Sequence, residues 1–155
     1  MSGGVHRGSP KMLRQIDTIC NKVGVYPHAF LSGHAHNYQR YTRTVRMNSK
    51  DYDVPFIVCG DGGHHVNTIV KAKRRERAQE PFFGTPVDYL DVKPVVQAKG
   101  LLLEKYNDRG YGYLRISVDK HHLSIGFHLV GQTSITQSRY DKVTVNLATH
   151  EMVSN

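Results

Sequence analysis

The sequence has no apolar run long enough to cross a bilayer. A transmembrane helix needs about 20 consecutive apolar residues, and no stretch of the 155 residues comes near that length. The first ten residues, MSGGVHRGSP, also lack the apolar core of a secretory signal. We therefore expect no membrane partner and a cytoplasmic location.

Cysteine is scarce, with only Cys20 and Cys59, and no CxxC pattern that would indicate a zinc ribbon. The two cysteines lie far apart in apolar stretches, and buried, reduced thiols are the interpretation we favour. Internal repeats and low-complexity segments are also missing. A chain of this length and composition therefore predicts a single domain spanning residues 1–155.

Acidic residues are few relative to basic ones, and the net charge is +8 with ten histidines. Much of the excess lies in the basic run 71–77, which either binds nucleic acid or another polyanion or forms a solvated surface. Aromatic residues that could stack on bases do not interleave with these charges. We favour the solvated surface, with a non-enzymatic basic binding module as the alternative function.

Regular elements can be assigned over most of the first sixty residues. Ser9 is suited to cap a helix and Pro10 to begin it, and the spacing of apolar residues predicts this helix over 10–23. A short apolar run then predicts a buried strand over 28–32. Further expectations are an edge-type strand over 41–47, a polar turn over 48–53 and a buried strand over 54–59.

The rest of the chain predicts strands after an irregular middle section. Residues 67–100 hold the basic run and three prolines, which predicts a short helix or loop followed by a surface insertion. Alternating residues predict a hairpin over 112–118 and 122–130, and a last strand over 142–147. The pattern indicates an α/β fold with a mixed sheet and an antiparallel C-terminal hairpin layer.

The segment Phe30–Arg40 contains the strongest candidates for metal-binding residues. His34 and His36 follow a predicted strand across Gly33, which lets the backbone turn at the strand end. We expect the two imidazoles to point to opposite sides and to serve two metal ions, which lie about 3.5–4 Å apart in two-metal phosphoesterase sites. Two ordinary loop histidines are the alternative.

The wider pattern, apolar-Ser-Gly-His-x-His-x-Tyr-x-Arg, resembles the final metal-binding motif of calcineurin-like metallophosphoesterases, and most closely that of the purple-acid-phosphatase-like branch. The likeness extends to the segments Val23–Pro27, Val54–Gly63 and Tyr106–Val118. It covers most of residues 8–130 and is weakest over 68–100.

The resemblance implies the C-terminal half of an α/β sandwich and, for the intact enzyme, hydrolysis of phosphate mono- or diesters. His34 would bind one ion and His36 the other, the ions being iron, manganese or zinc, and a metal-bound hydroxide would attack phosphorus. Asn37, Tyr38 and Arg40 would orient the loop or line the site. For Arg40, an ion pair and a phosphate contact are equally good expectations.

The first three motifs of the family are not found before residue 33: an Asp-x-His, a Gly-Asp with the bridging aspartate, and a Gly-Asn-His. The resemblance therefore implies a truncated phosphoesterase that holds metal weakly and turns over little or no substrate alone. Apolar faces left by the missing half predict self-association. A separate N-terminal partner chain that completes the site is a further alternative.

Four other residues are weighed as site residues. His6 lies near the place of the family's fourth motif, although its neighbours match the segment just after it. His64 and His65 either face the substrate cleft, add a third metal ligand or lie on a surface loop. Asp61 follows the histidine motif, so we expect a glycine turn in which it bonds local backbone rather than a bridging ligand.

Overall fold

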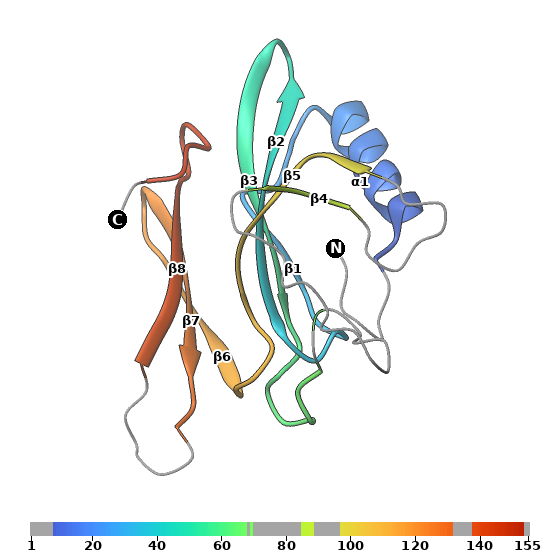
Figure 1. The fold of residues 1–155 in the computed structure, drawn as a ribbon. Coiled ribbons are helices and arrows are strands. Elements are labelled where there is room, and N and C mark those ends of the chain that lie inside the picture. The colour runs from blue at the N-terminus through green and yellow to red at the C-terminus, as the bar shows by residue number, and fades with distance from the viewer. Residues whose placement is uncertain (1–7, 68, 70–84, 89–96, 132–137, 154–155) are drawn as a thin grey trace.

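The computed structural model describes residues 8–67, 69, 85–88, 97–131 and 138–153. Within them the chain is a mixed α/β protein dominated by strands, and it forms three layers: a helix, a five-stranded mixed sheet and a three-stranded antiparallel sheet (Figure 1). The elements are α1 (Pro10–Val23), β1 (Phe30–Ser32), β2 (Tyr38–Met47), β3 (Lys50–Cys59), β4 (Thr85–Asp88), β5 (Gln97–Asn107), β6 (Gly112–Val118), β7 (His122–Leu129) and β8 (Ser138–Asn146).

Helix α1 begins and ends where the sequence predicts. The Ser9 hydroxyl accepts a hydrogen bond from the backbone N–H of Met12 at 3.2 Å, and Pro10 occupies the first turn. Gly24 ends the helix with φ at 76°, a left-handed conformation that glycine adopts without steric cost. The helix has 14 residues, and no helix in the described part of the chain is long and apolar enough to span a membrane.

The five-stranded sheet has the order β1-β3-β2-β5-β4. β1 is an edge strand and runs parallel to β3, whereas β2 pairs antiparallel with both β3 and β5. The prediction of an edge-type strand over 41–47 is therefore wrong. Some of its polar residues pair inside the fold: Arg43, for example, donates to both carboxylate oxygens of Asp17 in α1 at 2.6 and 2.7 Å.

A tight hairpin joins β2 to β3, and the polar turn predicted over 48–53 is too long. Only Asn48 and Ser49 lie outside the strands, with φ values of 51° and 63°. Two successive left-handed residues are typical of the type I′ turns that match the twist of a hairpin. β3 therefore begins at Lys50, four residues before the predicted strand.

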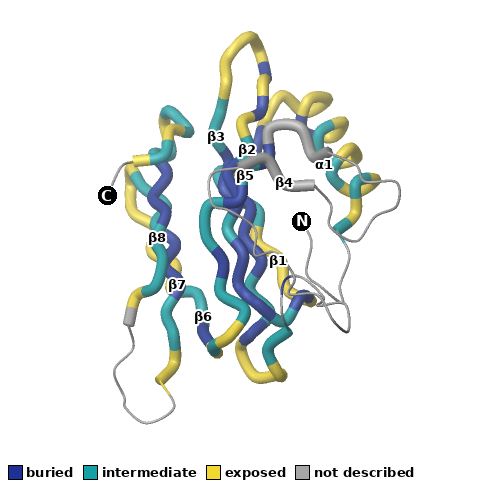
Figure 2. The backbone as a smooth tube through the Cα atoms, in the orientation of Figure 1, coloured by how far each residue is buried: buried dark blue, intermediate teal, exposed yellow. Residues whose placement is uncertain are grey.

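Two hydrophobic cores lie on opposite faces of the five-stranded sheet, and Figure 2 shows that buried residues concentrate in its central strands. On one face, Leu13, Ile16 and Cys20 of α1 pack against buried residues of β2, β3 and β5. On the other face, Tyr38 and Ile57 pack against the three-stranded sheet. The sheet is thus covered on both sides, which explains the near-continuous burial of β3 from Val54 to Val58.

The C-terminal layer has the order β6-β7-β8. The predicted hairpin over 112–118 and 122–130 is confirmed by β6 and β7, and the last strand begins four residues earlier than predicted. β5 was not predicted. Most of residues 67–100, including the basic run 71–77, lies outside the described residues.

Candidate metal site

Two loops meet at the carboxyl ends of the parallel strands β1 and β3. Residues 33–37 follow β1 and residues 60–67 follow β3, and ligand sites of α/β sheets collect at such an edge. The Gly60 N–H donates to the Asn37 carbonyl at 3.2 Å. A Cβ on Gly60 would overlap the carbonyl group of Ala35, so this close approach of the two loops requires glycine.

Three imidazoles gather where the loops meet. His36 comes from the first loop, and His64 and His65 come from the second. One ring nitrogen of each lies within 4.8 Å of those of the other two. The His64 ring centroid is 4.2 Å from that of His36 and 4.2 Å from that of His65. His36 is half-buried and the other two are exposed, so one partly covered ring lies beside two accessible ones.

His34 is not part of this three-imidazole cluster. Alternate residues of an extended strand share a face, so the expected divergence of the two motif histidines does not follow from strand geometry. The chain here is not extended: φ at His34 is 73°. A left-handed residue between β1 and β2 redirects the chain, and it accounts for His36 grouping with the second loop and not with His34.

A chain of hydrogen bonds connects His36 to the interior. The Asn67 side-chain nitrogen lies 3.3 Å from His36 Nδ1, and the Asn67 N–H donates to the His36 carbonyl at 2.8 Å. The buried Asn37 amide donates to the Asn67 carbonyl at 3.0 Å. Gln39 donates in turn to Asn37 Oδ1 at 2.6 Å and accepts from the Tyr41 hydroxyl at 2.5 Å. These buried amides fix the loop that carries His36.

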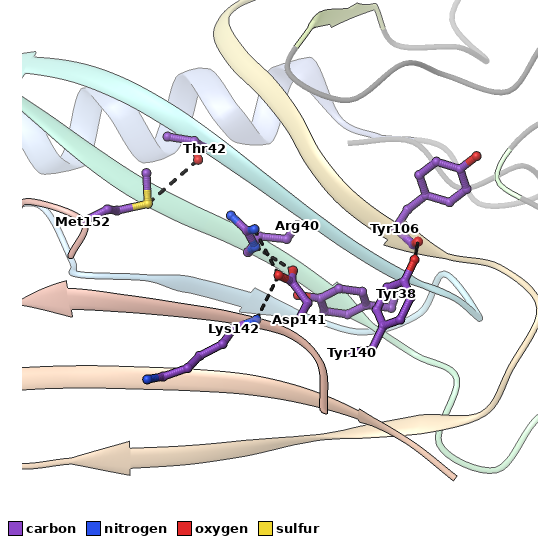
Figure 3. Close-up of polar contacts among 8 residues, drawn as sticks. All are labelled: Tyr38, Arg40, Thr42, Tyr106, Tyr140, Asp141, Lys142 and Met152. Atoms are coloured by element: carbon purple, nitrogen blue, oxygen red, sulfur yellow. Dashed lines mark hydrogen bonds and ion pairs between the residues drawn. The ribbon is translucent and has the colours of Figure 1, made fainter. Parts of the chain in front are cut away.

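Asn37 therefore connects the two loops, whereas Tyr38 and Arg40 point elsewhere. Both reach Asp141 of β8, across the space between the sheets (Figure 3). Arg40 Nε lies 2.7 Å from Asp141 Oδ2 and Nη2 lies 3.1 Å from Oδ1. Burial alone would lower the pKa of Arg40, but the hydrogen bonds and charge of Asp141 raise it. Of the two roles left open for Arg40, the structure shows the ion pair.

Asp61 is completely covered, with 0% of its surface exposed. Its Oδ1 accepts a hydrogen bond from the Cys59 thiol at 3.4 Å, and Oδ2 has no hydrogen-bond partner among the described residues. Burial raises the pKa of Asp61, and burial together with the Asp61 charge raises the pKa of Cys59 to about 12. Cys59 is therefore a thiol at neutral pH.

An open groove of about 450 Å³ lies beside the two loops. Its walls come from β1, from the start of β6 and from Gly33 and Gly62 of the loops; they include Leu31, Tyr113 and Leu114. The groove is mainly apolar and reaches the loops that hold the imidazoles.

The remaining predicted site residue, His6, lies outside the described residues. Asn67 was not predicted: it stands after a valine with no motif around it, and only the folded loop brings it to His36. No protein-family model, curated protein or solved structure matches the chain.

Proposed function

We propose that this chain supplies the C-terminal metal ligands of a calcineurin-like phosphoester hydrolase, with His34 and His36 bound to different ions. One observation carries the proposal. The Ser-Gly-His-Ala-His segment leaves β1 at the carboxyl edge of a parallel strand pair, directly beside a second loop that bears imidazoles. This is where α/β proteins place ligand sites.

The donor set is compatible with the metals of that family. Neutral imidazoles suit iron, manganese and zinc. The grouped ligands among the described residues are all histidines and include no carboxylate. Two cations about 3.5–4 Å apart repel each other strongly unless anionic ligands bridge them. We therefore expect the site to hold both metal ions only when an N-terminal partner segment supplies carboxylate ligands.

The groove supplies room for the organic part of a phosphate mono- or diester. Leu31, Tyr113 and Leu114 give it an apolar wall next to Gly33 and Gly62. A phosphate at the loop edge would place its substituent in this groove. Bound metal ions would activate water for attack on phosphorus and offset charge on the phosphoryl oxygens.

The test is metal-dependent hydrolysis of an aryl phosphate by two samples. The purified chain alone, supplied with iron, manganese or zinc, is expected to show turnover near background. The same chain mixed with or fused to the polypeptide encoded directly upstream is expected to gain activity. That activity should fall at least 100-fold in His34→Ala and in His36→Ala, whereas His121→Ala, at an exposed hairpin, should leave it unchanged.

Two results would count against the proposal. Strong hydrolysis by the chain alone would show that it needs no further ligands. Activity of the longer assembly that survives both histidine substitutions would show that the motif does not bind the catalytic metal.

A further inference from the structure

His36, His64 and His65 form a ligand set that needs nothing from outside the chain. Their ring nitrogens lie within 4.8 Å of one another. In a tetrahedral zinc site, a Zn–N distance of about 2.0–2.1 Å puts ligand nitrogens about 3.3 Å apart. The rings must therefore close by no more than about 1.5 Å, and His64 and His65 are exposed, so rotation of their side chains meets little resistance.

The second loop is built to present two adjacent imidazoles together. Gly62 and Gly63 precede them, and Gly63 has φ at 138°, a conformation that L side chains rarely adopt. The turn brings the His64 and His65 centroids to 4.2 Å. The loop is also held to the first one, because the Asn67 N–H donates to the His36 carbonyl. Both halves of the ligand set are thus fixed relative to each other.

A side-chain amide lies beside His36 Nδ1, where metal-bound histidines usually have a hydrogen-bond acceptor. Asn67 lies 3.3 Å from His36 Nδ1, which makes Nε2 the natural ligand atom. A side-chain amide presents either N–H or oxygen by turning over. With its oxygen toward His36, Asn67 would accept the Nδ1 proton and hold the ring in the tautomer that binds a metal through Nε2.

We propose that His36, His64 and His65 bind one divalent transition-metal ion, with Zn²⁺ as the preferred ion, in a site that shares only His36 with the two-metal site proposed above and does not use His34. Three neutral imidazoles favour zinc, cobalt, nickel or copper over magnesium and calcium, which prefer oxygen ligands. Three protein ligands leave the fourth position of a tetrahedral ion open to water or to a phosphate oxygen. This proposal goes beyond the hydrolase and does not depend on it.

The experiment is a zinc titration of the full, tag-free chain in competition with a chromogenic chelator. We expect one zinc per chain. His36→Ala, His64→Ala and His65→Ala should each weaken binding at least 10-fold, and Asn67→Ala should weaken it by about 10–100-fold, the usual effect of losing an outer-shell partner. His121→Ala, an exposed residue outside both proposed sites, should bind as the unchanged chain does. Magnesium should not compete.

Circular dichroism melting without metal serves as the folding control, and the exposed positions of His64 and His65 predict unchanged curves. Zinc binding that survives the combined His64→Ala and His65→Ala substitutions would overturn the proposal. Equal loss in His121→Ala, or no zinc bound at micromolar concentration, would do the same. Because no ester is present in this titration, its failure leaves the hydrolase proposal standing, and inactivity toward esters leaves this one standing.

Discussion

Two histidines far apart in the chain stack against each other at the C-terminal turn. The rings of His28 and His150 lie 3.8 Å apart with 18° between their planes, and His28 Nε2 lies 2.9 Å from the Leu147 carbonyl oxygen. His150 Nδ1 is covered and has no hydrogen-bond partner among the described residues. Burial, and then the charges of His28 and of nearby Lys50, lower the pKa of His150. The fold therefore favours the neutral ring.

Stability should fall in mildly acidic solution because of this residue. An unfolded histidine has a pKa of about 6.5, so the unfolded chain takes up the proton more readily than the folded one. The contribution of the neutral His150 ring to the unfolding free energy is complete above pH about 6.5. It is lost as the pH falls through the lower pKa that His150 has in the folded chain. We expect His150→Asn to reduce the loss of unfolding free energy between pH 8 and pH 5, measured by urea denaturation.

Asparagine is the appropriate replacement because φ at position 150 is 59°, and asparagine tolerates left-handed backbone. His121→Asn, at an exposed position, is the control and should keep the original pH dependence. A pH dependence unchanged by His150→Asn would show that the stacked pair does not govern acid stability.

At the scale of elements, the approach of the two site loops depends on one glycine. A Cβ on Gly60 would overlap the backbone of Ala35, whereas a Cβ on Gly62 would meet its nearest atom, the Gly112 carbonyl oxygen, at an ordinary 3.5 Å. We expect Gly60→Ala to lower the unfolding free energy by about 1–3 kcal/mol, the usual cost of overpacking, and to weaken zinc binding by moving His36. Gly62→Ala should change stability by less than about 0.5 kcal/mol.

Urea denaturation and the zinc titration measure the two effects on the same samples. A Gly60→Ala chain as stable as Gly62→Ala would mean that the loops can separate without cost. It would also remove the reason for treating the two loops as one rigid site.

The elements that the sequence predicts correctly are those with local signals. Ser9, Pro10 and Gly24 mark the ends of α1, and strict alternation marks β6 and β7. β2 was misjudged because its arginines resemble solvent-facing residues, although Arg40 and Arg43 pair with carboxylates from distant parts of the chain. Long-range pairing of this kind has no local signal.

In the candidate site too, the sequence indicates individual residues but not how the fold groups them. His34 and His36 stand out through the wider pattern apolar-Ser-Gly-His-x-His-x-Tyr-x-Arg, and His64 and His65 were considered as cleft, ligand or surface residues. That His36 groups with the second pair, and not with His34, depends on a left-handed residue and on the parallel register of β1 and β3. Neither feature can be read from composition or spacing alone.

At the scale of the whole molecule, one buried ion pair ties the two sheets together. Arg40 and Asp141 have side chains only 14% and 8% exposed, and Tyr38 adds a hydrogen bond to the same carboxylate at 2.8 Å (Figure 3). Removing one partner of a buried pair leaves an uncompensated charge. We expect Arg40→Ala to lower the unfolding free energy by about 3–5 kcal/mol.

The same strand offers a matched control. Arg46 pairs with Asp51 at 3.7 Å, but these side chains are 70% and 57% exposed, and exposed pairs contribute about 0–1 kcal/mol. Urea denaturation of Arg46→Ala should therefore be close to that of the unchanged chain. An Arg40→Ala variant that loses no more unfolding free energy than Arg46→Ala would show that the Arg40–Asp141 pair contributes no more than a surface pair.

The position of β1 at the margin of its sheet has a practical consequence. This strand has a neighbour on one side only among the described residues, and Leu31 within it is 47% exposed. The unpaired backbone groups of such an edge strand can pair with another extended segment, either from an N-terminal partner or from a second molecule. The chain should then be less soluble alone than together with an N-terminal partner segment that pairs with β1.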